Sequence, residues 1–109
     1  MIRILVQRGT EDSVRRIRVE GHSGYAEAGS DIVCAAVSVL CITLANGLRK
    51  YGDTPISARS SSADYELVFC ETYRDGSVAD SLVKTVLDGM SAIAQKYPGF
   101  VEIREEHLV

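Results

Sequence analysis

The 109-residue sequence contains no tryptophan, only two histidines and no pair of cysteines in the spacing Cys-x-x-Cys. The clustered histidine and cysteine ligands of a zinc site are therefore missing, and we expect no metal. A basic excess is missing as well, because 12 lysines and arginines stand against 15 acidic residues, for a formal net charge of −3. Proteins that bind nucleic acid directly carry a basic patch, so that class of partner is not expected.

The sequence also has no segment with the pattern of an export signal. Residues 1–6 alternate like a strand and lack the charged start and long apolar core of a signal peptide. The longest apolar stretch, residues 32–45, is shorter than the roughly 20 residues that cross a bilayer. Three cysteines, Cys34, Cys41 and Cys70, cannot all pair within one chain. Free thiols without an export signal predict a protein of the reducing cytoplasm.

The composition is typical of one globular domain, which we expect to cover residues 1–109. Hydrophobic residues make up 46% of the chain and charged residues 25%, and no linker or repeat divides it. Apolar side chains alternate with polar ones, as in β-strands, in five segments. These segments are residues 2–6, 14–20, 56–62, 65–71 and 101–103. The first two and the next two are close enough in sequence to form hairpins.

A first helix is predicted from Ile32 to a point between residues 46 and 51, with Ser30 or Asp31 as its N-cap. Of its first 14 residues, 12 are apolar, so the helix is apolar on nearly every side. Such a helix has to be covered on more than one face. In a small domain the sheet supplies one cover, and a partner subunit supplies the other. We therefore expect a homodimer with this helix at or near the interface.

A second helix follows the turn at residues 75–77 and ends at Pro98-Gly99. Its apolar residues form one stripe, from Leu82 to Tyr97, and charged residues occupy the opposite side. The resulting order of elements is ββαββαβ. This order predicts an α+β fold, a two-layer sandwich in which a mostly antiparallel sheet of about five strands carries two helices on one face.

Cys34 and His22 are the candidate catalytic residues. Cys34 falls in the first turn of the first helix, where unpaired backbone amides and the helix dipole favour a negatively charged sulfur. His22 comes twelve residues earlier, at the end of a strand and before a glycine-containing loop. An imidazole beside such a thiol makes a thiolate–imidazolium nucleophile. The alternative is a buried structural cysteine and an unrelated surface histidine.

The other two cysteines serve as internal comparisons. Cys41 lies seven residues after Cys34, about 10 Å further along the helix, which is too far for a disulfide between them. We interpret Cys41 as core packing, and Cys70, in an apolar strand, in the same way.

Asp31, Ser38 and Tyr25 are supporting candidates with two possible roles each. The Asp31 carboxylate caps the helix or orients His22, and the cap is favoured. Ser38 lies one turn after Cys34, where it lines the site or bonds back to the Cys34 carbonyl. Tyr25 anchors the loop or contacts substrate. We assign no role to His107, near the C-terminus.

These residues occur in a pattern of about eighteen positions with fixed internal spacing. The pattern resembles the signature of the ribosomal-processing cysteine protease (Prp) family of bacteria. It consists of Gly21-His22, Tyr25-Ala26, Gly29 and Asp31-Ile32-Val33-Cys34-Ala35-Ala36-Val37-Ser38. Outside this signature the resemblance lies in length and order of elements, and it covers essentially the whole chain.

The resemblance implies a small cytoplasmic, dimeric endopeptidase that removes a short N-terminal extension from a large-subunit ribosomal protein. His22 would be the general base and Cys34 the nucleophile, with Asp31 and Ser38 in support. The reaction needs no metal or organic cofactor. Backbone amides at the helix start, including that of Cys34, would form the oxyanion hole. Two alternatives are a non-catalytic ribosome-associated binding module and a thiol redox protein.

The loop from Ser23 to Ser30 is the expected substrate loop, and Ser23, Gly24, Tyr25 and Gly29 are its candidate contacts. It has little apolar surface to bury, so we expect it to be mobile without substrate and ordered over a bound peptide. The alternative is a rigid loop packed by Tyr25.

Overall fold

The structure, a computed structural model, describes residues 1–27 and 30–108. Within these ranges it contains seven main elements in the predicted order ββαββαβ. They are β1 (Ile2–Arg8), β2 (Val14–Glu20), α1 (Ile32–Tyr51), β3 (Ile56–Ser61), β4 (Asp64–Phe69), α2 (Val78–Lys96) and β5 (Val101–His107). A single 3₁₀ turn at Thr10–Asp12 joins β1 to β2.

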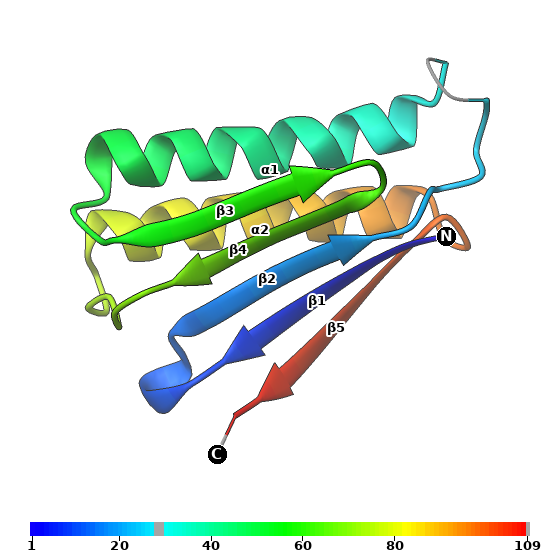
Figure 1. The fold of residues 1–109 in the computed structure, drawn as a ribbon. Helices are drawn as coiled ribbons and strands as arrows, with labels where there is room; N and C mark the ends of the chain where they lie inside the picture. The colour runs from blue at the N-terminus through cyan, green and yellow to red at the C-terminus, as the bar shows by residue number, and fades with distance from the viewer. Residues whose placement is uncertain (28–29, 109) are drawn as a thin grey trace.

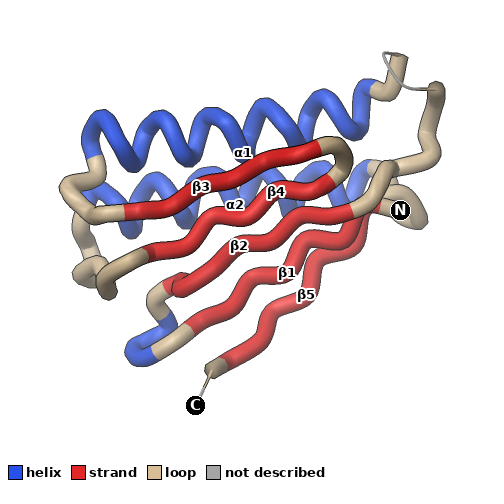
Figure 2. Tube along the Cα trace, viewed as in Figure 1, coloured by secondary structure: helices blue, strands red, loops and turns tan. Residues whose placement is uncertain are grey.

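The five strands form one sheet in the order β3-β4-β2-β1-β5. Three of the four strand pairs are antiparallel, and only β1 and β5 run parallel. Figures 1 and 2 show both helices on the same face of this sheet, which makes two layers. The predicted fold class is therefore confirmed.

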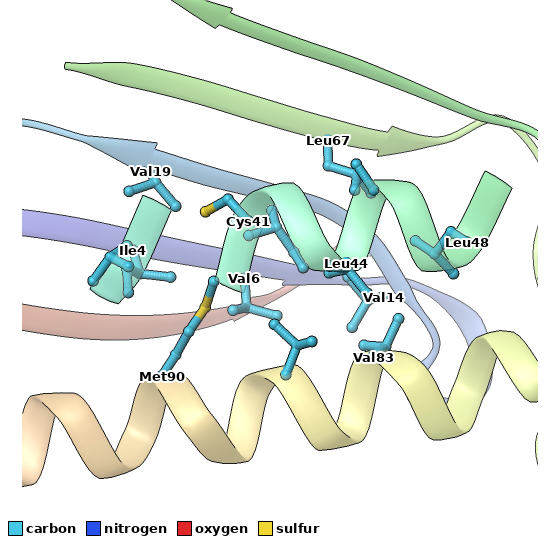
Figure 3. Packing of buried hydrophobic residues seen from close by; sticks show 14 of the residues in the cluster. Ile4, Val6, Val14, Val19, Cys41, Leu44, Leu48, Leu67, Val83 and Met90 are labelled. Carbon is cyan, nitrogen blue, oxygen red and sulfur yellow. The ribbon is translucent and has the colours of Figure 1, made fainter. Parts of the chain in front are cut away.

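The core lies between the sheet and the helices. The buried residues of α1, at positions 33, 37, 41, 44, 45 and 48, lie on one side of the helix, as the helical period requires. They face alternate residues of the strands and one stripe of α2, and Figure 3 shows ten members of this cluster by name. These are Ile4, Val6, Val14, Val19, Cys41, Leu44, Leu48, Leu67, Val83 and Met90.

The opposite side of α1 remains exposed although it is apolar. Ile32, Val39 and Ile42 are all more than half exposed. With 20 residues, α1 is longer than the apolar stretch considered in the sequence, and by length and composition it is able to cross a membrane. The buried stripe nevertheless makes α1 the central helix of this domain's core.

The prediction for Cys70 is wrong. Cys70 is exposed and follows the last residue of β4. Leu67 and Phe69 point into the core, so the two-residue period of a strand turns Cys70 away from it.

Candidate active site

His22 is placed by a turn at the end of β2. Gly21 has φ of +91°, and its N–H donates to the Ala63 carbonyl at 2.9 Å. A Cβ at Gly21 would lie 2.5 Å from the carbonyl oxygen of Met1, so a side chain has no room there. The glycine lets the chain leave the sheet and presents His22 as an exposed side chain.

Asp31 holds the start of α1. Its Oδ1 accepts hydrogen bonds from the amides of Val33, at 3.0 Å, and Cys34, at 2.9 Å. The favoured role as N-cap is therefore confirmed. Its Oδ2 accepts a hydrogen bond from the buried Ser23 hydroxyl. The Ser23 hydroxyl, and after it the Cys34 amide, lower the pKa of Asp31 from 3.8 to about 2.

The Cys34 side chain is partly exposed in the first turn of α1. The Ser23 backbone N–H donates to its Sγ at 3.4 Å. The Cys34 amide itself is bound to Asp31, so the expectation that this amide contributes to an oxyanion hole is wrong for the state described. Ser23 thus holds Cys34 in two ways: directly at the sulfur and through the shared Asp31 carboxylate.

His22 and Cys34 line the same groove, which has a volume of about 370 Å³. Ser38 and Ile42 of α1 form one wall of it, and the β3–β4 hairpin forms the other. In the part of the chain that the structure describes, His22 and Cys34 are not hydrogen-bonded to each other. The fold therefore brings the two predicted catalytic residues to one groove but leaves the imidazole and the sulfur without a direct bond.

Tyr25 anchors the first part of the loop. Its ring makes edge contacts with Tyr97 and Phe100, at centroid distances of 5.5 and 5.3 Å. Its N–H donates to the Ser23 hydroxyl at 3.0 Å, and the neighbouring Gly24 is exposed. These contacts favour the packed-loop alternative for this part. Gly29 lies outside the described residues, and movement of the loop on substrate binding stays a prediction.

Cys41 behaves as a core residue. Its side chain is buried on the inner side of α1, and burial raises the pKa of its thiol to about 12. Its backbone carbonyl accepts a hydrogen bond from the Tyr65 hydroxyl at 3.0 Å. The interpretation of Cys41 as packing is confirmed, and its thiol stays protonated at neutral pH.

Two hollows on the molecule differ in chemistry. A larger one, of about 880 Å³, is lined by residues of the β1–β2 turn and α2. It contains His107, which contacts Asp12 at 2.8 Å, but no cysteine. Of these two, the smaller groove is the one that combines a thiol with an imidazole.

The hairpin wall of the groove was missed in the sequence. Ser60, Ser61, Ala63 and Tyr65 line the groove, and none of them is a candidate in the sequence analysis. The sequence contains only an indirect signal for this wall. Residues of the hairpin turn can approach His22 only if that turn lies beside the end of β2. That pairing between β2 and β4 is not readable from either strand alone.

An α+β sandwich with a free cysteine at a helix start, and a histidine in the same open groove, defines a candidate cysteine peptidase. The comparison with known families agrees with this class. Residues 1–102 match the family described as cysteine protease Prp, and the chain belongs to that family.

Solved structures support the fold. The essential ribosomal processing protease Prp from S. aureus, in complex with a covalently linked product peptide, superposes with a TM-score of 0.89 at 20% identity, over 97% of this chain and 100% of that one. The same S. aureus protease with a substrate peptide gives 0.84 at 19%, with the same coverages. SMU.848 from Streptococcus mutans gives 0.83 at 28% identity, over 99% and 96%. No curated protein matches the sequence.

Proposed function

We propose that this member of the family is the endopeptidase that removes the short N-terminal extension of a large-subunit ribosomal protein precursor. The observation that carries the proposal is the groove in which Cys34, at the start of α1, lies with His22. The S. aureus protein of the same fold is described as a ribosomal processing protease and was solved with peptides. We place the activity in the cytoplasm, where free thiols persist.

The proposed mechanism uses a Cys-His dyad. The Cys34 thiolate attacks the scissile carbonyl, and His22 as imidazolium donates its proton to the leaving amine as the carbon–nitrogen bond breaks. The remaining thioester is hydrolysed by water, which His22 deprotonates, and the sulfur leaves as thiolate. Asp31 supports Cys34 by fixing the first turn of α1, and Ser38 lines the groove. Each proton and each bond in these steps is accounted for without a metal or an organic cofactor.

The direct test is incubation of the wild-type protein with the extended precursor. We expect one cut, detected as a product whose mass corresponds to loss of the extension and a single new N-terminus. A precursor that stays intact while the protein is folded would favour the non-catalytic binding module instead.

The thiol redox alternative has little support in the geometry. Cys41 is buried, with its pKa raised to about 12. Cys70 is exposed and follows Phe69, which pairs with Ile56 at one end of the β3–β4 hairpin. The groove lies at the opposite end of this hairpin, where Ser61 pairs with Asp64. Neither thiol is therefore placed as a resolving partner for Cys34.

We further propose a homodimer built on the exposed apolar side of α1, with no direct nucleic-acid contact. Val39 is 60% exposed and does not line the groove.

Val39→Glu should weaken dimerisation about 100-fold, because an unpaired carboxylate would be buried at the interface. Sedimentation over a concentration series would measure this change. The matched control is Val78→Glu on α2, also an exposed valine (53%), which should leave the dimer intact. A wild-type protein that stays monomeric at micromolar concentration would contradict the proposal.

A further inference from the structure

The outer edge of β3 has no strand partner among the described strands. β3 is the end strand of the sheet and pairs only with β4. The Cys70 N–H donates to the Pro55 carbonyl, and the register continues this pairing through Ser57 with Val68. Because successive residues of a strand point their backbone groups to opposite sides, the odd-numbered residues bond to β4. The N–H and C=O groups of Ala58 and Ser60 therefore point outward.

The free edge of β3 ends near the groove that contains Cys34. Ser60 lines the groove from β3, and Ser38 lines it from α1. Figure 1 shows that β3 runs toward the end of the molecule at which α1 begins, and Cys34 lies in the first turn of α1. Ser60 and Cys34 line the same groove, so an extended chain bound beside Ser60 would lie next to the groove that contains the sulfur.

We propose that the substrate main chain adds to the sheet as an extra strand beside β3. Ser60 would donate its N–H to a substrate carbonyl and accept from a substrate N–H, and Ala58 would repeat this two residues away. The inference rests on the proposed function, because it places the scissile carbonyl at Cys34.

The chemistry of the groove specifies the occupant as an extended polypeptide segment. Polypeptide backbone supplies the alternating donors and acceptors that an open edge lacks. Along an added strand, alternate side chains face the groove. The groove floor is formed by buried Val37 and Cys41 together with half-buried Tyr65, so apolar side chains are expected at those positions.

Proline at position 60 tests the edge from the protein side. Ser60→Pro removes an N–H that bonds to no other strand, and proline is tolerated at such edge positions. With a synthetic peptide spanning the extension–body junction of the precursor, we expect kcat/KM to fall at least ten-fold. The rate of Cys34 alkylation by iodoacetamide should not change, because that reagent has no backbone to pair.

The matched control is Glu105→Pro on β5, the other end strand. The Ile2 and Leu108 amides donate to Phe100 and Arg8 carbonyls, so even-numbered residues of β5 face β1 and the Glu105 N–H points outward. This variant should keep kcat/KM within two-fold. Ala58→Pro provides a second edge variant if Ser60→Pro does not fold.

The same peptide with single N-methyl groups tests the edge with wild-type protein. An N-methyl group should weaken cleavage where it replaces a substrate N–H that would bond to Ser60 or Ala58. These N–H groups belong to alternate residues of the peptide. Binding of these peptides to the Cys34→Ala protein, measured by calorimetry, should show the same alternation without requiring cleavage.

The two proposals fail in different ways. Equal cleavage and binding for all N-methyl peptides, with full activity of Ser60→Pro, would overturn strand addition while the protease function stands. A changed sedimentation coefficient in Ser60→Pro at full activity would assign the edge to a second copy of the chain and overturn it also. Alternating binding without cleavage by wild-type protein would keep the added strand and contradict the proposed function.

Discussion

Cys34→Ala is expected to abolish precursor cleavage, with a loss of about 10³-fold or more in kcat, while the fold and peptide binding remain. The substitution removes the sulfur that would form the acyl intermediate. Cys34 is only partly buried and alanine continues the helix, so the free energy of unfolding should change by less than about 1 kcal/mol. Product mass spectra and chemical denaturation measure the two effects separately.

The other cysteines are the controls for this variant. Cys41→Ala leaves a small cavity in the core and should lower the stability by about 1–2 kcal/mol while cleavage continues. Cys70→Ala, at an exposed position, should change neither quantity. Full activity of a folded Cys34→Ala protein would remove Cys34 from the role of nucleophile.

His22→Ala is expected to lower kcat by about 10²–10⁴-fold, the usual contribution of a positioned acid–base group. His22 is exposed and is turned out of the sheet by Gly21, so its removal should leave the stability nearly unchanged. Single-turnover kinetics with the junction peptide would show the loss in the chemical step rather than in KM.

His107→Ala is the matched control, because His107 is the only other histidine in the sequence. It is exposed on β5 and contacts Asp12 within the larger hollow that contains no cysteine. The variant should keep full activity. Equal effects of the two substitutions would show that His22 has no special role.

Most of the fold was predictable because local patterns agree with the final packing. The two-residue period of Ile2, Ile4 and Val6 and the apolar stripe of α2 each match the buried face of the element. Asp31 and Ser77 cap α1 and α2 in the structure. These signals act within a few residues of each other, so they can be read from the sequence.

The site was predictable only in part. The helix start at Cys34 and the loop from His22 follow from short-range patterns. The hairpin wall depends on the pairing of β2 with β4, which joins residues more than 40 positions apart, such as Glu20 and Asp64. The hydrogen bond from the Cys34 amide to Asp31 depends on the rotamer of the Asp31 side chain. The exposure of Cys70 depends on which residues of its strand face the core. Neither is encoded in residue spacing.

The Asp31 cap has a consequence for pH-dependent measurements. A carboxylate whose pKa lies below its unfolded value stabilises the fold fully above about 3.8, and this contribution is lost as the pH falls toward about 2. Proton uptake at Asp31 is therefore linked to unfolding only in strong acid. Between pH 5 and 8 the cap keeps one charge state, so a rate that varies in that interval reports on other groups in the groove. The acid stability curve and the pH–rate curve can accordingly be assigned to separate protons.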